Sequence, residues 1–266
     1  MSASRFALVA VAALLLPTLA ASVVLPPPAA LGGGWLRVPV GEKLAIDVLE
    51  ANSAEQTRLV DVALDADHAT AAQDPYGVVI WPAAQVCAAE IAASEIGGRR
   101  VLELGAGTGL CSLAAAACGA ADVLATDYRD EPLALLRQSA ERGGFALRTA
   151  QFDILDAARP LPAADVLVAA DLLYLRSTSE ALGRRCAEAL RAGCASIIVG
   201  DCGRPGRAAF LAALVASGVR EESARFEEVD GWSAGTARHE LISTSHAAPT
   251  ATGVGLLRLT PGDLIE

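Results

Sequence analysis

A glycine-rich turn, Gly-Ala-Gly-Thr-Gly at residues 105–109, constrains the fold of this chain more than any other feature of its sequence. The turn directly follows an apolar run at residues 100–104 and leads into an apolar stretch that is typical of a helix. Glycines allow the backbone to approach a ligand without Cβ clashes, and the start of a helix presents free N–H groups. The pattern therefore predicts a strand, a ligand-binding turn and a helix, with a tight turn that binds nothing as the alternative.

The spacing of these glycines excludes several ligand classes. The dinucleotide fingerprint requires a glycine three residues after Gly107, where this chain has Leu110. A P-loop requires Gly-Lys-Ser/Thr after the glycines, and that sequence does not follow here. The GxGxG spacing therefore argues against NAD, FAD and P-loop nucleotides.

Strands and helices alternate along the rest of the chain. The apolar patterns predict strands at residues 100–104, 122–126, 147–152, 166–170, 196–200, 222–229 and 253–259. They predict helices at residues 83–96, 109–118, 130–142, 179–190 and 207–216. The last two strands lack a long intervening helix, so we expect an α/β fold with a doubly wound, mostly parallel, seven-stranded sheet that ends in an antiparallel pair.

The N-terminal part differs in composition from this domain. Residues 1–22 contain one arginine, an apolar run and then small residues, an order typical of a signal or targeting presequence. Residues 23–34 are rich in proline and glycine and predict a linker. Short apolar pieces within residues 35–73 predict a small β element. The main domain is expected at residues 74–262.

The six cysteines form no CxxC pair and are accompanied by only three histidines, so we expect reduced thiols and no metal site. A presequence predicts transport, whereas reduced cysteines predict a reducing destination. Import into an organelle, a chloroplast or a mitochondrion, satisfies both. The secretory lumen and the cytosol, the latter with a wrongly assigned start codon, stay open as alternatives.

Charge limits the expected partners. The chain has 31 acidic and 21 basic residues, a formal net charge of −10, and no dense run of positive side chains. Binding to a phosphate backbone requires such a run. We therefore expect no nucleic-acid partner. We also expect a monomer without a membrane partner once the presequence is removed.

Two carboxylates follow strands beside the glycine turn. Asp127 follows the strand at 122–126, where a carboxylate can accept hydrogen bonds from both ribose hydroxyls of a nucleoside. Asp153 follows the next strand, where it can accept a hydrogen bond from an adenine amino group while Phe152 covers the flat face of the base. The alternatives are a helix cap for Asp127 and an ordinary surface position for Asp153.

Together with Asp127, the segments at residues 101–109 and 170–174 resemble the seven-β-strand class I methyltransferases, and within them the branch that contains protein-lysine methyltransferases. That branch carries an acidic residue, two variable residues and an aromatic residue after the fourth strand, as in Asp-Leu-Leu-Tyr here. Residues 75–85 resemble the segment that opens the domain in that branch. Residues 197–205 resemble a stretch of electron-transfer-flavoprotein β-subunit lysine methyltransferase and of bacterial nicotinamide N-methyltransferase-like proteins, with Cys202 in place of their proline.

The resemblance implies a Rossmann-like methyltransferase fold, S-adenosylmethionine as cofactor and a protein that presents a lysine as partner. Trp81 would then pack beside the adenosine end of the cofactor, and Glu103 would hold its amino-acid end. The expected cofactor-binding residues are Trp81, Glu103, Gly105, Gly107, Gly109, Asp127, Phe152 and Asp153. The expected catalytic residues, which would face the incoming amine, are Asp171 and Tyr174.

The chemistry of methyl transfer independently favours a catalytic role for Asp171 and Tyr174. Methyl transfer from a sulfonium needs a neutral, aligned nitrogen, whereas a free lysine, with a pKa of about 10.4, is mostly protonated at neutral pH. Asp171 can accept a hydrogen bond from the amine and stabilise the charged product, and Tyr174 can offer its ring or hydroxyl. The alternative is that Asp171 caps the next helix and Tyr174 is a core residue.

Arg204 lies in a Gly-Arg-Pro-Gly turn after the fifth strand, at the sheet edge where ligands collect. A contact with substrate and a brace for the loop are equally open. For the whole chain, the expected activity is methyl transfer to a protein lysine. The alternatives are an N-methyltransferase for a small nicotinamide-like acceptor and a catalytically silent domain that binds a partner protein.

Overall fold

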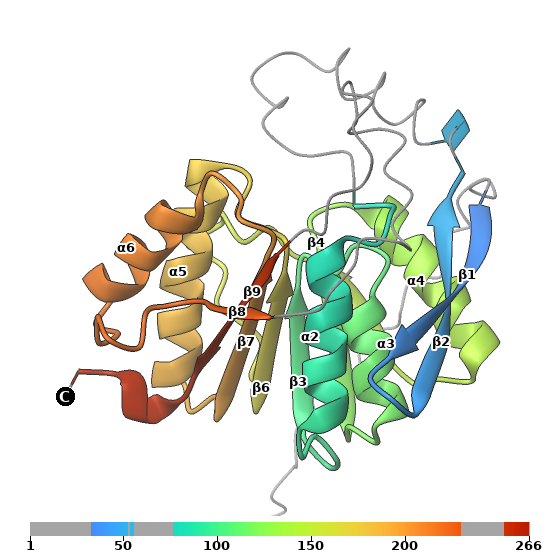
Figure 1. Cartoon of the computed structure of the whole chain (residues 1–266), viewed down its shortest axis with the longest axis horizontal. Coiled ribbons are helices and arrows are strands. Elements are labelled where there is room, and N and C mark those ends of the chain that lie inside the picture. The colour runs from blue at the N-terminus through green and yellow to red at the C-terminus, as the bar shows by residue number, and fades with distance from the viewer. Residues whose placement is uncertain (1–32, 53, 56–76, 230–252, 266) are drawn as a thin grey trace, which may run out of the picture.

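A computed structural model of the chain describes residues 33–52, 54–55, 77–229 and 253–265 (Figure 1). The expected presequence at residues 1–22, most of the expected linker and part of the β element expected at residues 35–73 lie outside these residues. Among the described residues, no helix combines the length and the apolar character needed to cross a membrane.

Seven strands form the central sheet, in the order β5-β4-β3-β6-β7-β9-β8 (Figure 1). Their bounds are Arg100–Leu104 for β3, Asp122–Asp127 for β4, Arg148–Gln151 for β5, Val166–Ala170 for β6, Ser196–Asp201 for β7, Glu227–Val229 for β8 and Val254–Leu259 for β9. Strands β3 to β7 pair in parallel, whereas β9 pairs antiparallel with both β7 and β8. The predicted fold class is therefore confirmed.

Helices cover both faces of the sheet. They are α2 (Pro82–Ala93), α3 (Leu110–Ala117), α4 (Asp130–Gly143), α5 (Arg176–Arg191) and α6 (Arg207–Ala216), and a short 3-10 helix, η1 (Pro261–Asp263), follows β9. Figure 1 shows α2, α3 and α4 on one face and α5 and α6 on the other. Strand β6 explains this arrangement, because Val166 and Val168 join the core on the α2–α3 side while Leu167 and Ala169 join the core on the α5–α6 side. A strand buried on both faces needs such a continuous apolar run.

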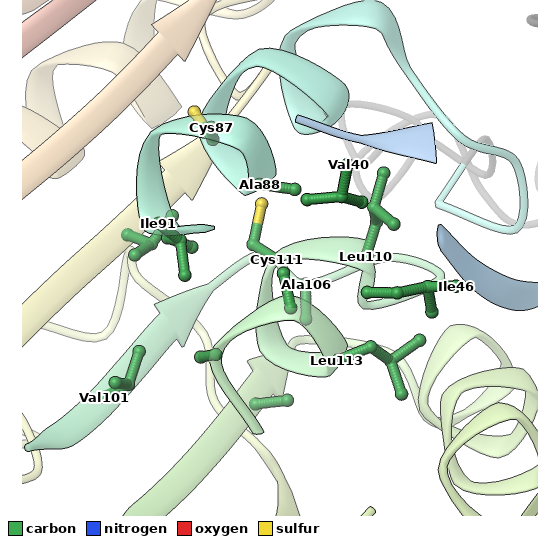
Figure 2. Close-up of a cluster of buried hydrophobic side chains, with 14 of the residues drawn as sticks. Val40, Ile46, Cys87, Ala88, Ile91, Val101, Ala106, Leu110, Cys111 and Leu113 are labelled. Atoms are coloured by element: carbon green, nitrogen blue, oxygen red, sulfur yellow. The ribbon is translucent and has the colours of Figure 1, made fainter. Parts of the chain in front are cut away.

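An antiparallel hairpin of β1 (Gly33–Val40) and β2 (Leu44–Ala51) forms the small N-terminal β element. Val40 and Ile46 of the hairpin pack into the cluster between α2 and α3 (Figure 2). The N–H of Leu49 donates to Oγ of Ser139 on α4. The hairpin is therefore anchored to the helices on one face of the main sheet and does not extend that sheet.

Some predicted bounds are wrong, each for a local reason. The helix predicted at residues 83–96 ends at Ala93, because Ser94 adopts an extended backbone. The helix predicted from residue 109 begins at Leu110, since Gly109 has a left-handed conformation. Of the strand predicted at residues 222–229, only the last three residues pair with β9, because turns that hydrogen-bond back to Arg220 occupy residues 221–224.

All six cysteines are free thiols in the structure. Four are buried and two, Cys118 and Cys202, are half-buried, and burial raises the pKa of Cys202 to about 12. Within the described part of the chain, no group of three or more His, Cys, Asp or Glu side chains is placed to hold a metal ion.

Candidate active site

The candidate site lies where the strand order reverses. Strands β4 and β5 follow on one side of β3, and β6 and β7 lie on its other side. At such a switch point the loops after neighbouring parallel strands diverge and leave a crevice. A cleft of about 660 Å³, open to solvent, occupies this position.

Seven of the ten residues predicted for the site line this cleft, and they come from four separate stretches of the chain. They are Trp81, Glu103, Gly105, Gly107, Asp127, Asp171 and Tyr174. Residues that sequence reasoning missed also line it, among them Tyr128, Arg129 and Leu172. Tyr128 could be predicted from the sequence, because it directly follows Asp127 at the end of β4.

The glycine turn leaves β3 at the floor of this cleft. Gly107 has a φ of 54°, and its N–H donates to Oδ2 of Asp127 at 3.0 Å. A Cβ at this position would lie 2.9 Å from the carbonyl oxygen of Gly77. Gly109 does not line this cleft and instead lies against Leu136 of α4.

Replacing Gly107 with alanine is therefore expected to weaken cofactor binding by at least about tenfold. A side chain is strained at positive φ, and the new methyl group would displace either Gly77 or the N–H that holds Asp127. The affinity is measured by calorimetry with S-adenosylhomocysteine. Gly119→Ala serves as the control, because Gly119 also has a positive φ but its Cβ would meet no atom within 4 Å. Equal affinity in both variants would contradict this role of Gly107.

Asp127 is buried, with each carboxylate oxygen already holding one backbone N–H. Oδ2 accepts from Gly107, and Oδ1 accepts from Arg129 at 3.1 Å. Burial raises the pKa of Asp127 to about 6, and the backbone hydrogen bonds oppose that shift. No cap by its side chain is found at α4, whose N-cap position is Arg129. Each oxygen retains a further lone pair that a ligand hydroxyl can use.

Glu103 is 2% exposed and is tied to the first turn of α3. Its Oε2 accepts from both the N–H and the hydroxyl of Ser112, at 2.9 and 2.5 Å. Burial raises the pKa of Glu103 to about 7, against the lowering effect of these hydrogen bonds. The carboxyl group therefore lines the cleft and also fixes the helix that follows the glycine turn.

A second cavity of about 410 Å³ adjoins the cleft and shares Gly105, Tyr128, Leu172 and Tyr174 with it. Phe152 and Asp153 line only this second cavity, whereas Trp81 lines only the first. The three residues that were expected near an adenosine are thus divided between two cavities.

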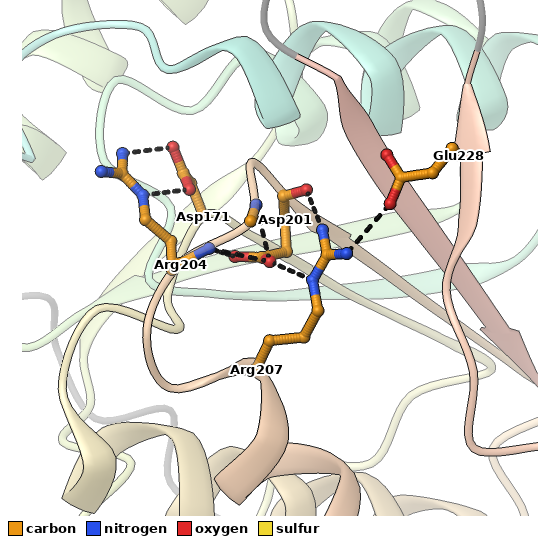
Figure 3. Close-up of polar contacts among 6 residues, drawn as sticks. Asp171, Asp201, Arg204, Arg207 and Glu228 are labelled. Carbon is orange, nitrogen blue, oxygen red and sulfur yellow. Dashed lines mark hydrogen bonds and ion pairs between the residues drawn. The ribbon is translucent and has the colours of Figure 1, made fainter.

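Asp171 does not cap a helix. It directly follows β6, has a φ of 59°, and its side chain is 1% exposed. Nε and Nη2 of Arg204 donate to its two carboxylate oxygens, each at 2.8 Å (Figure 3). The same guanidinium lies 4.7 Å from the centre of the Trp81 ring. Arg204 therefore contacts two residues of the cleft.

A second ion pair shapes the loop that carries Arg204. Asp201, at the end of β7, accepts from the N–H groups of Gly203 and Arg204, and from Nε of Arg207 at 2.6 Å. Arg207 also donates to Glu228 of β8 (Figure 3). These bonds connect the loop, α6 and the antiparallel edge of the sheet.

Comparison with known proteins identifies the family. A family model described as lysine methyltransferase matches residues 62–205, more than half of the chain. The chain belongs to this methyltransferase family. Its cofactor is accordingly S-adenosylmethionine, as expected from the sequence.

Other methyltransferases are similar over parts of the chain. Ribosomal protein L11 methyltransferases of Pseudomonas paraeruginosa and Pseudomonas aeruginosa are 35% identical over 95 residues, which are 35% of this chain and 32% of each relative. The chain thus spans about a third of the length of these curated relatives. Among solved structures, SMU.776, assigned as a methyltransferase and solved with SAH, is 13% identical with a TM-score of 0.50, over 88% of this chain and 57% of that one. This likeness shows the fold alone.

Proposed function

We propose that this protein transfers a methyl group from S-adenosylmethionine to a lysine side chain of another protein. The observation that carries the proposal is that Asp171 and Tyr174 line the same cleft as the glycine turn and Asp127. A group that can receive an amine therefore lies within one cavity of the groups suited to the cofactor. The family description and the name of the L11 methyltransferases both point to a protein acceptor.

The residues in the cleft suit the cofactor chemically. S-adenosylmethionine supplies, when bound, a methyl group on a positively charged sulfonium, and it also carries an α-ammonium, a ribose and an adenine. Asp127 can accept from the ribose hydroxyls, and Glu103 can pair with the α-ammonium. The second cavity, lined by Phe152, suits the adenine ring. Trp81 lies against the Arg204 guanidinium, which pairs with Asp171, so we assign Trp81 to the acceptor side and not to the adenosine.

The acceptor side must bind an amine and align it. A lysine enters mostly protonated and must lose its proton to water, because only the nitrogen lone pair can form the new bond to the methyl carbon while the carbon–sulfur bond breaks and its electron pair returns to sulfur. Asp171 accepts a hydrogen bond from the amine and stabilises the positive charge of the methylated product. Tyr174, half-buried at the junction of the two cavities, helps to fix the direction of approach.

The full-length protein is expected to bind S-adenosylmethionine with micromolar affinity in calorimetry, because the cleft offers both Asp127 and Glu103 to it. Incubation of the protein with a cell lysate and methyl-labelled cofactor is then expected to label a discrete protein band, with methyllysine found after hydrolysis. A boiled sample of the same protein is the control.

The other outcomes separate the alternatives. Label in small molecules only would favour a nicotinamide-like acceptor. Cofactor binding without any transfer would favour a silent binding domain. No binding of the cofactor would contradict every methyltransferase activity.

A further inference from the structure

Two arginine–aspartate pairs of nearly the same build lie at the carboxyl ends of the neighbouring strands β6 and β7 (Figure 3). In the first, Arg204 and Asp171 have side chains 26% and 1% exposed, and the guanidinium is 4.7 Å from the ring of Trp81. In the second, Arg207 and Asp201 have side chains 25% and 0% exposed, and the guanidinium is 4.6 Å from the ring of Phe226. Because the two pairs are alike in burial and ring contact, any other structural difference between them indicates a difference in function.

The pairs differ in their access to the cleft and in their other bonds. Asp171 lines the cleft and Asp201 does not. Arg207 donates to three acceptors, since Glu228 and the carbonyl of Asp201 supplement the carboxylate. Among the described residues, Asp171 is the only acceptor of the Arg204 side chain. The Arg204 guanidinium is thus held by fewer groups and borders the site of the reaction.

The backbone on both sides of the Arg204 pair is fixed independently of that pair. The N–H groups of Gly203 and Arg204 donate to Asp201, and the N–H of Gly206 donates to the carbonyl of Leu173. The N–H of Asp171 donates to the carbonyl of Gly200. The guanidinium can therefore leave the carboxylate while the loop and the carboxylate stay in place.

A buried carboxylate needs a positive partner, because an unpaired buried charge is strongly destabilising. In this structure the Arg204 guanidinium spans both oxygens of Asp171, so an incoming ammonium would lie beside a like charge and must displace Arg204 to bind there. A lysine ammonium carries the same charge as the guanidinium and can replace it without leaving Asp171 unpaired. The aromatic ring of Trp81 can continue to hold the displaced guanidinium.

We propose that Arg204 determines acceptor specificity by occupying the acceptor-cation site on Asp171 until a protonated amine takes its place. The inference rests on the proposed function and deepens it. Only a cationic acceptor can complete the exchange, since a neutral ring such as a pyridine brings no charge to Asp171. The protein thereby selects an amine when the acceptor binds, before the amine loses its proton and receives the methyl group.

The test uses n-butylammonium chloride, which reproduces the end of a lysine side chain, with the full-length chain at pH 7. Arg204→Ala is expected to bind this probe at least about tenfold more tightly than the wild-type protein, measured by saturation-transfer NMR, because removal of a competing state raises apparent affinity. Neutral 1-pentanol, of similar shape, is expected to show no gain.

Two further variants isolate the cause. Arg207→Ala removes an equally buried guanidinium from Asp201, outside the cleft, and is expected to bind the probe no better than wild type. Adding Asp171→Asn to Arg204→Ala is expected to abolish the gain.

Equal affinity of wild type and a folded Arg204→Ala for n-butylammonium would overturn the inference. If Arg204→Ala does not fold, Arg204→Lys provides the test, because a single ammonium replaces a two-pronged guanidinium and is easier to displace. No gain in Arg204→Lys would then overturn it. Failure of this inference leaves cofactor binding and lysine labelling intact, whereas failure of the proposed function removes them.

Discussion

Replacing Asp171 with asparagine is expected to lower methyl transfer by at least about 100-fold, the loss typical for removal of a group that stabilises developing charge. Affinity for S-adenosylmethionine is expected to stay within about threefold, because the predicted cofactor contacts come from the glycine turn and Asp127. Asparagine is a suitable replacement, since it keeps the shape of the side chain and tolerates the positive φ of this position. Transfer is measured with labelled cofactor on the lysate protein that wild type methylates, and affinity by calorimetry.

Asp165 offers a matched control at the opposite end of the same strand. It directly precedes β6, as Asp171 directly follows it, and it accepts two hydrogen bonds from the Arg100 guanidinium, at 3.2 and 2.7 Å. Asp165→Asn is expected to retain full transfer, because Asp165 does not line the cleft. Comparable losses in the two variants would show that Asp171 acts through stability and not through the acceptor.

Replacing Glu103 with glutamine is expected to stabilise the cofactor-free protein at pH 8 and to weaken cofactor binding. Burial raises the pKa of Glu103 from 4.5 to about 7 in the folded state. Between these values the folded protein keeps a proton that the unfolded chain has released, so the stability contributed by this group is present below pH 4.5 and is lost as the pH rises through 7. A shift of this size corresponds to about 3 kcal/mol. Glutamine stays neutral at every pH, so the variant does not lose this stability as the pH rises.

Urea unfolding without cofactor measures the first effect. The free energy of unfolding of Glu103→Gln is expected to exceed that of wild type by about 3 kcal/mol at pH 8 and to approach it near pH 4. Calorimetry measures the second effect, where loss of a charge-assisted bond to the α-ammonium is expected to weaken binding by about 10- to 100-fold. A variant that is no more stable at pH 8 would show that Glu103 ionises normally despite its burial.

The sequence predicts β3, β6 and α6 residue for residue, because each is a mostly apolar stretch with clear turn signals at both ends. It also places the site, since the ends of parallel strands meet at one sheet edge and the carboxylates after β4 and β6 belong to that edge. Bounds set by a single backbone conformation, such as the end of α2 at Ser94, follow no periodicity and are missed.

Pairings inside the site were beyond sequence reasoning. Arg204 follows Asp171 by 33 residues, and their contact depends on how Asp201 folds the loop after β7. The sequence alone therefore does not distinguish a contact with substrate from a brace for the loop as the role of Arg204. Trp81 and Phe152 likewise line separate cavities, which no residue pattern indicates.

Because the strand order reverses between β3 and β6, one half of the sheet carries the residues proposed to bind the methyl donor and the other half carries those proposed to bind the acceptor. Residues assigned to the methyl donor lie at or just after the carboxyl ends of β3, β4 and β5, whereas Asp171 and Arg204 follow β6 and β7. Substitutions in the loops after β6 and β7 can therefore change the acceptor while the donor half remains intact. In evolutionary terms, new substrates for this scaffold are expected to arise from the β6–β7 half, and the β3–β5 half is expected to be inherited unchanged.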